Sequence, residues 1–357
     1  MNILWIIKRW TMGQDVISDR FGRYYHLPVG LARRGHRVLV LALDYRTARN
    51  EHLVDAGVEW KGVGFKPFGP LPCLWETLRA LRRFHPDRIV GATDMYFSIL
   101  GGLLGRVYGT AVVHDVYDHF ESYASGRLFK LGPWYYRALD RSHAVIAFNR
   151  KLSAYLRAKS PHTRHTVIPN CADPALFRRL DATWCRTRLG LPPHVPLIGY
   201  FGAIEASRGM DTLWQAFERV RLVVPEIELV LAGRLENSSD ANRPGVRYLG
   251  FLPHKEVPLL INACNLNVIC YKRDLFAEYS LPFKGVEYMA CGAAFVAPRV
   301  GAMPEEPGVS AEMLYEPENH RDLAAKILLN LESGRRSYPE VMNWDDAAER
   351  MEHVLES

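Results

Sequence analysis

Residues 280–292, SLPFKGVEYMACG, contain the start of a helix and run directly into an apolar stretch at 293–297. Ser280 can cap the free backbone N–H groups of the helix, and Pro282 fits its first turn, where a missing N–H does no harm. The apolar stretch that follows predicts a buried strand. A helix followed at once by a buried strand is typical of a doubly wound α/β domain.

Two charged residues of this helix indicate what it binds. Lys284 stands in the first turn, and Glu287 follows about one turn later. A helix start carries a partial positive charge that favours a phosphate, and a carboxylate accepts hydrogen bonds from sugar hydroxyls. We therefore predict a site for a diphosphate next to a ribose, as in a nucleotide sugar. The alternative is an ordinary helix start with an i,i+3 surface pair.

The bulk composition indicates a folded protein of two domains. The chain has 357 residues, of which 48% are hydrophobic and 24% are charged. It contains no run of eighteen apolar residues, so we expect no membrane-spanning helix, and no signal-peptide pattern precedes the first strand. Six scattered cysteines indicate buried thiols in a reducing cytoplasm rather than disulfides or a metal site.

The charge is divided unevenly along the chain. Residues 1–180 hold 27 Lys+Arg against 14 Asp+Glu, whereas residues 181–357 hold 18 against 25. The basic first half suggests an anionic partner, such as a phosphorylated acceptor or an anionic membrane face. Helices that are simply solvated by arginine would give the same composition.

The apolar runs alternate with helical patterns along the whole chain. Strands are expected at 2–8, 36–43, 58–63, 88–92, 110–115 and 143–148, and the pattern restarts at residue 197. We predict an α/β fold of two tandem doubly wound Rossmann-like domains that face each other across a cleft. The predicted domains are 1–180 and 197–340, with a linker at 181–196. A C-terminal helix is expected in 341–357, for which a return to the first domain is one option.

The common nucleotide and metal signatures are absent from the sequence. No Gly-x-Gly-x-x-Gly follows a strand, no phosphate-binding Gly-x-x-x-x-Gly-Lys-Ser/Thr occurs, and there is no Asp-x-Asp pair. These absences argue against dehydrogenases and NTPases. We expect no metal and no cofactor, so that lysine, arginine and backbone N–H groups must neutralise the diphosphate.

Six stretches resemble, in order, the motifs of one enzyme family. They are LARRGHRV (31–38), VIPNCAD (167–173), GYFG (199–202) with RGMD (208–211), the segment 280–292, VGAMPE (300–305) and Trp344 before the last helix. Together they resemble glycosyltransferases of the GT-B fold, most closely family 4, over nearly the whole chain. The resemblance implies transfer of a sugar from a nucleotide-diphosphate donor that binds mainly to the second domain.

The resemblance also implies a set of donor-binding residues. They are Gly13, Gly202, Arg208, Tyr279, Ser280, Pro282, Lys284 and Glu287. Several family positions differ in this chain. The family's first glutamate falls on Tyr279, with Glu278 one residue off; its arginine falls on Ala203; and Arg208 replaces a lysine. Arginine can bind a phosphate in a bidentate manner where lysine is a point charge.

The loop at 114–121, HDVYDHFE, supplies the candidates for a catalytic base. It follows a predicted strand of the first domain, at the sheet edge where ligands bind. Asp118 is the first candidate, with Asp115, His119 and Glu121 next, and Glu278 is the candidate from the second domain. Because aspartate and histidine are also common in turns, a structural role is equally compatible with the pattern.

Two segments of the first half, 74–84 and 123–137, mix aromatic with basic residues. This mixture predicts a patch that rests on the inner face of a membrane, near a lipid-linked acceptor. Core aromatics with solvated arginines are the alternative. No nucleic-acid partner is expected, because no recognisable nucleic-acid-binding module is present.

The leading hypothesis is a metal-independent hexosyltransferase that acts in polysaccharide, glycolipid or natural-product biosynthesis. It would be cytoplasmic or peripheral on the inner membrane face. The family resemblance favours retention of the anomeric configuration over inversion. Two alternatives stay open: a nucleotide-sugar epimerase or hydrolase of the same fold, and a nucleotide-sugar-binding protein without catalysis.

Overall fold

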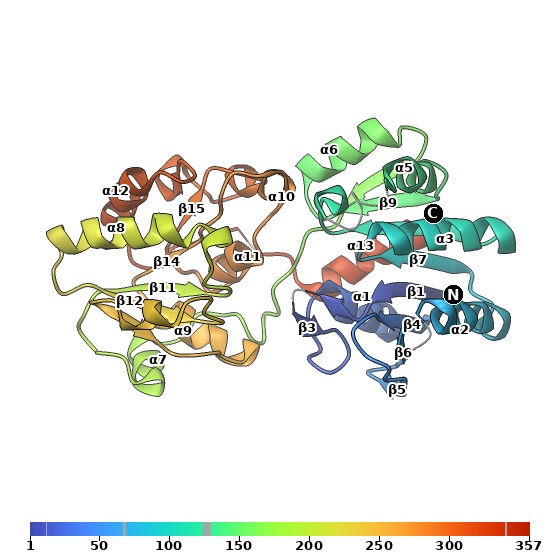
Figure 1. The fold of residues 1–357 in the computed structure, drawn as a ribbon, viewed down its shortest axis with the longest axis horizontal. Helices are drawn as coiled ribbons and strands as arrows, with labels where there is room; N and C mark the ends of the chain where they lie inside the picture. The colour runs from blue at the N-terminus through green and yellow to red at the C-terminus, as the bar shows by residue number, and fades with distance from the viewer. Residues whose placement is uncertain (12, 67–68, 124–129, 340) are drawn as a thin grey trace. The chain divides into compact units, whose positions relative to one another are not determined.

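The chain folds into two compact units, shown in the computed structural model of Figure 1. The structure describes residues 1–357 except 12, 67–68, 124–129 and 340. The first unit comprises residues 1–171 together with 342–357, and the second comprises residues 172–341.

The first unit is built on an eight-stranded sheet with the order β10-β9-β8-β7-β1-β4-β6-β5. All neighbouring strands run parallel except β5, which pairs antiparallel with β6. The strands are β1 (Asn2–Lys8), β4 (Arg37–Asp44), β5 (Glu51–Asp55), β6 (Val58–Gly64), β7 (Arg88–Ala92), β8 (Ala111–Val116), β9 (Ala144–Ala147) and β10 (Arg164–Val167). A short hairpin, β2 (Trp10–Thr11) and β3 (Gln14–Asp15), follows β1.

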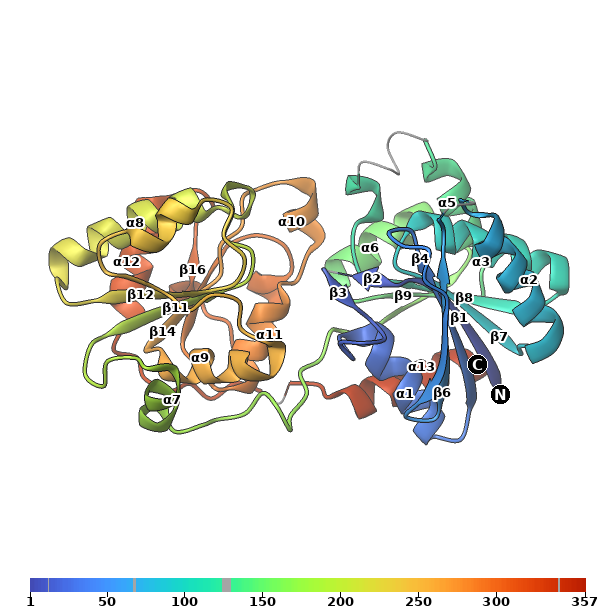
Figure 2. The same cartoon turned by 60° about the horizontal axis from the view of Figure 1, so that its bottom comes forward.

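Helices cover both faces of this sheet. Figure 2 shows α1 and α13 together on one face and α2, α3 and α5 on the other. The helices are α1 (Arg23–Arg33), α2 (Leu71–Phe84), α3 (Met95–Tyr108), α5 (Gly132–Asp140), α6 (Arg150–Lys159) and α13 (Trp344–Glu356). Gly30 lets α13 approach α1 closely, because a Cβ atom at Gly30 would lie 2.4 Å from Cβ of Ala348.

The second unit has a six-stranded parallel sheet with the order β13-β12-β11-β14-β15-β16. The strands are β11 (Leu197–Phe201), β12 (Glu228–Ala232), β13 (Val246–Tyr248), β14 (Leu266–Val268), β15 (Phe295–Pro298) and β16 (Leu314–Tyr315). The helices are α7 (Ala182–Leu189), α8 (Met210–Val223), α9 (Val257–Ala263), α10 (Leu275–Tyr279), α11 (Phe283–Ala290) and α12 (His320–Asn330). One core lies under α8 and α12, and a second lies under α7 and α9.

These sheets confirm the predicted class of two doubly wound α/β domains. The predicted linker at 181–196 differs from the structure, because it contains α7 and belongs to the second unit. Asp181 caps this helix by accepting a hydrogen bond from the Trp184 N–H at 2.7 Å, and Cys185 is fully buried. The prolines of the segment suggested an irregular linker, but its apolar residues pack into the core. The chain passes between the units after residues 171 and 341 instead.

No helix within the described ranges combines the length and the apolar character that a membrane span requires. All six cysteines are free, and five of them are buried.

Candidate functional site

The ammonium group of Lys284 lies beside two aromatic rings at the end of β11 in the second unit. Lys284 stands in the first turn of α11, and its Nζ lies 4.0 Å from the ring centroid of Tyr200 and 5.6 Å from that of Phe201. Both rings belong to the end of β11. Aromatic faces attract a cation, so the rings hold the ammonium at the carboxyl edge of the sheet. This is the edge at which open α/β sheets bind ligands.

Two glycines make room for this lysine. Gly202 has φ +119, and a Cβ atom there would lie 2.9 Å from both Cε and Nζ of Lys284. Gly233, which follows β12, has φ +132, and its Cβ atom would lie only 2.0 Å from the Gly202 carbonyl oxygen. A side chain at either position would displace the backbone or the lysine. The ends of β11 and β12 therefore present bare backbone beside the ammonium group.

Burial makes the Lys284 ammonium group a stronger acid than that of an ordinary lysine. Burial lowers the pKa of Lys284 to about 8, Cys270 and Glu287 oppose this shift, and Arg208 adds to it. An anionic ligand next to Nζ would raise this pKa again, because an opposite charge favours the protonated form. The site is thus better suited to an anion than to a neutral ligand.

The carboxylate of Glu287 is buried one turn along α11 from Lys284. Its Oε1 lies 2.9 Å from Nε2 of His254, and the residue is 4% exposed. Burial raises the pKa of Glu287, and the hydrogen bond with His254 and the charge of Lys284 oppose that shift. His254 was not foreseen from the sequence, although it begins a short 3₁₀ helix a few residues after β13, at the carboxyl edge.

Arg208 supplies a second positive charge near Lys284. Its guanidinium lies 5.7 Å from the ring centroids of Tyr271 and Phe276. Its Nε lies 3.3 Å from Oε1 of Glu205, and both side chains are more than one third exposed. Such an exposed pair holds the arginine only weakly, so Arg208 can turn towards an anion.

The start of α11 differs from the expectation in one detail. Ser280 does not cap this helix: it ends α10, and its hydroxyl donates to the Ala277 carbonyl at 3.0 Å. Pro282 takes the N-cap position, and no side chain caps α11 within the described residues. The short helix α10 is the reason, because it turns Ser280 away from the N–H groups that follow. The Ser280 carbonyl instead accepts a hydrogen bond from the Ala302 N–H at 2.9 Å.

The positions of three further residues from the predicted site neither support nor exclude the roles predicted for them. Glu278 and Tyr279 form the end of α10 and are half-buried. Gly13 lies in the first unit, in the turn between β2 and β3, with φ +81 and open space around it.

Asp118 and His119 follow β8 in the first unit and are both buried. Oδ2 of Asp118 accepts a hydrogen bond from the Tyr123 hydroxyl at 2.8 Å, and Oδ1 accepts one from the His119 N–H at 2.8 Å. His119 Nε2 lies 3.3 Å from Oε2 of Glu121. The hydroxyl and the N–H fix the orientation of the Asp118 carboxylate.

Asp115, the second candidate for the base, forms a buried ion pair with Arg23. Its two oxygens accept hydrogen bonds from Nη2 and Nε of Arg23 at 2.7 and 2.9 Å, and Asp115 is fully buried. Nη1 of Arg23 donates to the Ile168 carbonyl and to Oδ1 of Asn170, both at 3.1 Å. These contacts favour a structural role for Asp115, and its catalytic role stays a prediction.

Two residues near Asp118 were not foreseen. Lys8 ends β1, and Asp94 follows β7; Asp94 is 8% exposed, and its Oδ1 has no hydrogen-bond partner within the described ranges. Burial raises the pKa of Asp94, and the charge of Lys8 opposes that shift. Each residue lies directly at the end of an apolar strand run, and that position was the signal that could have identified them.

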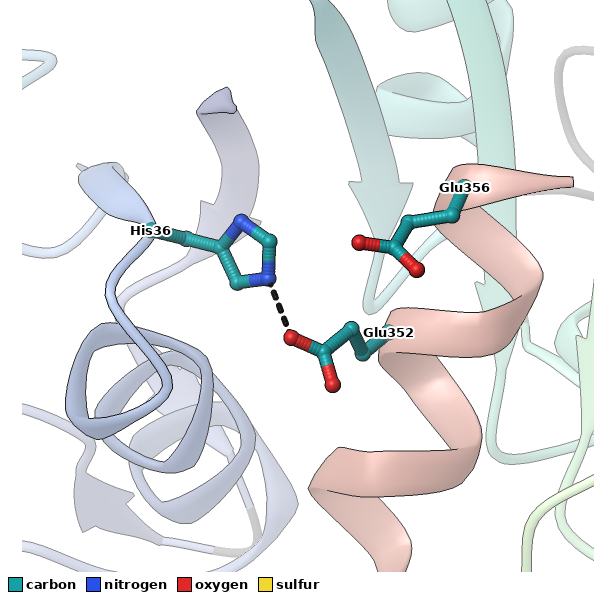
Figure 3. A group of neighbouring side chains, drawn as sticks. All are labelled: His36, Glu352 and Glu356. Carbon is teal, nitrogen blue, oxygen red and sulfur yellow. Dashed lines mark hydrogen bonds and ion pairs between the residues drawn. The ribbon is translucent and has the colours of Figure 1, made fainter.

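One group of side chains in the first unit has the composition of a metal site. Single ligand atoms of His36, Glu352 and Glu356 lie within 4.8 Å of one another (Figure 3). The His36 ring is already engaged: Nε2 lies 2.7 Å from Glu352, and Nδ1 lies 3.2 Å from the amino group of Met1. Nε of Arg34 donates to the second Glu352 oxygen at 2.6 Å. This group is a network of ion pairs that fastens α13.

Comparison with known families matches both units. A model described as "Glycosyl transferase 4-like domain" matches residues 23–171, and one described as "Glycosyl transferases group 1" matches residues 195–333. The chain is a GT-B glycosyltransferase that resembles family 4. The resemblance predicted from the sequence is thereby confirmed.

Two curated relatives of the chain are also named as glycosyltransferases. A phosphatidylinositol N-acetylglucosaminyltransferase subunit of Arabidopsis thaliana is 23% identical over 98% of this chain and 81% of its own length. The putative colanic acid biosynthesis glycosyl transferase WcaI of Escherichia coli K12 is 25% identical over 70% of this chain and 67% of its own length.

Solved structures share the fold of this glycosyltransferase. Sucrose-phosphate synthase from Thermosynechococcus elongatus superposes with a TM-score of 0.80 at 18% identity, over 100% of this chain and 98% of that one. HepE from Anabaena in complex with UDP-glucose gives a TM-score of 0.72 at 16% identity, over 99% of both chains.

Proposed function

We propose that this glycosyltransferase takes its sugar from a nucleoside-diphosphate donor that binds at the carboxyl edge of the second unit. The observation that carries the proposal is the placement of Lys284 Nζ beside the bare backbone of Gly202, with the buried carboxylate of Glu287 one turn away. The HepE and trehalose-6-phosphate structures that share the fold contain UDP, UDP-glucose or UDP-2-fluoro glucose, which supports a donor of this kind.

The chain's own cations would perform the electrostatic part of the reaction. Charge builds on the leaving diphosphate, and preorganised positive groups that face this charge stabilise the transition state. Lys284 and Arg208 are the groups that would neutralise it, so we propose that transfer needs no metal ion. Glu287 would hold the ribose: one oxygen is fixed by His254, and the other accepts hydrogen bonds from the sugar hydroxyls.

Variants of His254 test the ribose site. We expect His254→Ala to raise the donor KM about tenfold with little change in kcat, because a lost hydrogen bond to a charged group weakens ground state and transition state alike. Steady-state kinetics with UDP-glucose measure both constants. His194→Ala, at an exposed histidine of the same unit, is the matched control and should leave both unchanged. A fall in kcat at constant KM would contradict the positioning role.

We further propose that the sugar is transferred with retention of its configuration. In that case the leaving phosphate can take the acceptor proton, and Asp118 acts only by orienting groups. Asp118→Asn should then lower kcat by less than tenfold, whereas loss of a general base typically lowers it by about 10²–10⁴-fold. Proton NMR of the product gives the anomeric configuration. An inverted product together with a large loss in kcat would show that Asp118 is the base.

The acceptor we propose is a hydroxyl of a lipid-linked or small molecule, in polysaccharide, glycolipid or natural-product synthesis in the cytoplasm. Lys8, Asp94 and Asp118 at the carboxyl edge of the first sheet are the polar groups that would meet it. Incubation with UDP-, GDP- and dTDP-sugars, with and without acceptor, separates this function from its alternatives. Turnover without any acceptor would indicate an epimerase or hydrolase, and binding without turnover would indicate a catalytically inactive protein.

A further inference from the structure

The outward face of α2 is apolar where a solvated helix would be polar. The helix, LPCLWETLRALRRF, buries Cys73, Thr77, Ala80, Leu81 and Phe84 against the sheet. Its opposite face begins with Leu71, Leu74 and Trp75, which are 68%, 43% and 64% exposed. Packing against the sheet explains why the buried residues are apolar, but it does not explain the three exposed apolar side chains. Neighbouring groups of the chain leave these three side chains largely open to solvent.

The rest of the same face is positively charged. Arg79, Arg82 and Arg83 are all exposed over the last two turns of α2. The helix has a single acidic residue, Glu76, which forms an ion pair with Lys61 and lies 3.5 Å from Nη1 of Arg79. The outward face therefore runs from apolar side chains to three arginines whose charge the helix itself does not balance.

Helix α3 extends this surface. It covers the same face of the sheet as α2, since both helices contribute to one core cluster, and Figures 1 and 2 show them side by side. Leu103, Val107 and Tyr108 are exposed on α3 together with Arg106, and the helix has no acidic residue. Nearly half of the large apolar side chains that are exposed in the described part of the chain lie on these two helices.

We propose that this face of α2 and α3 docks on an anionic lipid bilayer. Tryptophan and leucine enter the boundary between lipid headgroups and acyl chains, whereas arginine binds the lipid phosphates above it. The apolar residues at the start of α2 and the arginines at its end would therefore each meet the part of the bilayer that suits them. Tryptophan and arginine are also enriched at protein interfaces, so a protein partner is an outcome that the test must separate from lipid binding. The docking would bring the first unit to a lipid-linked acceptor, and to that extent it rests on the proposed function.

Sedimentation with vesicles tests the docking without any substrate. The full chain should bind vesicles of phosphatidylcholine mixed with phosphatidylglycerol and should bind pure phosphatidylcholine vesicles far more weakly. Replacing Arg79, Arg82 and Arg83 by glutamine should reduce the partition coefficient by about a hundredfold, because each basic residue contributes roughly a factor of five at an anionic surface. The double variant Leu74→Ser/Trp75→Ser should reduce it about tenfold or more.

A matched control is available in the second unit. Leu222 and Val223 of α8 are 84% and 65% exposed, and Leu222→Ser/Val223→Ser should bind vesicles as the unchanged chain does. Equal binding to both vesicle types, or unchanged binding of the arginine variant, would overturn the proposal. So would dimers, seen by light scattering, that Leu74→Ser/Trp75→Ser disperses, because a second copy would then cover the face.

Membrane docking and sugar transfer can be tested independently of each other. Transfer to a water-soluble acceptor, measured without vesicles, should be the same in the unchanged chain and in the α2 variants. Vesicle binding by a chain that transfers no sugar would refute the function and leave the docking intact. Equal melting temperatures of the variants show that a loss of binding does not come from unfolding.

Discussion

Replacement of Lys284 by alanine is expected to lower kcat/KM for the nucleoside-diphosphate donor by about 10²–10³-fold, the range found when one preorganised stabiliser of transition-state charge is removed. Lys284 is the cation whose place is fixed by the surrounding structure, through the rings of Tyr200 and Phe201 and the bare backbone of Gly202. Arg208 is more exposed and held by a weak pair, so it should compensate for only part of the loss.

The kcat/KM of the unchanged chain for the donor should also fall as the pH rises above about 8. The pKa of Lys284 is lowered to about 8 by burial, so the ammonium loses its proton in that range, and the donor diphosphate loses its partner. Donor binding at this pH should take up a proton, because the diphosphate favours the charged lysine. Calorimetry in two buffers of different ionisation enthalpy measures that uptake.

The free energy of unfolding should change with pH in the direction opposite to the activity: it should increase as the pH rises above about 8. The folded-state pKa lies below the ordinary value of 10.5, so folding disfavours the charged form of Lys284. This unfavourable contribution is complete below pH 8 and is relieved as the pH rises from about 8 to 10.5. The site therefore keeps a charge at neutral pH at the expense of stability, as is common where a group serves binding.

Two variants serve as controls for Lys284. Lys284→Arg keeps a positive charge at every accessible pH and should remove the decline above pH 8, whatever its effect on the rate. Lys326→Ala, on α12, removes an exposed hydrogen bond to the Ala311 carbonyl and should leave donor kinetics unchanged. A Lys284→Ala variant with normal kcat/KM would refute the assigned donor site.

The alternation of strands and helices was predictable from the sequence, because each buried strand is an apolar run and each helix has a buried stripe. The placement of Lys284 and Glu287 on one face of α11 was predictable for a related reason: residues three apart on one helix share a face. The role of Ser280 was not, since it depends on the five-residue helix α10, which leaves no clear periodic signal.

Contacts between distant segments could not be predicted from local patterns. His254 and Glu287 are 33 residues apart, and Arg23 and Asp115 are 92 residues apart. Asp115 and Asp118 look equivalent in the sequence, since both stand near the end of the same predicted strand, 110–115. The two residues differ in the folded structure, because Asp115 pairs with the buried guanidinium of Arg23 from α1 and Asp118 does not.

Removal of that guanidinium is expected to destabilise the first unit severely. Arg23→Ala leaves the buried carboxylate of Asp115 without its two hydrogen bonds and leaves the Ile168 carbonyl and Asn170 Oδ1 without theirs. Breaking a buried ion pair from one side typically costs about 3–5 kcal/mol, because an uncompensated charge remains. Hydrogen exchange of peptides from β1 and β8 measures this loss locally, with peptides from β11 and β12 of the second unit as an internal reference.

Matched variants show whether the loss of stability comes from burial of the Arg23–Asp115 ion pair or only from the loss of a positive charge. Arg33→Ala breaks an exposed pair with Asp345 at 3.5 Å and should change stability by no more than about 1 kcal/mol. The double variant Arg23→Met/Asp115→Leu should recover much of the loss, since an apolar pair of similar volume needs no compensating charge. If Arg23→Met/Asp115→Leu were as well protected from exchange as the unchanged chain and yet transferred no sugar, the structural role assigned to Asp115 would be wrong. Asp115 would then belong among the groups that act on the acceptor.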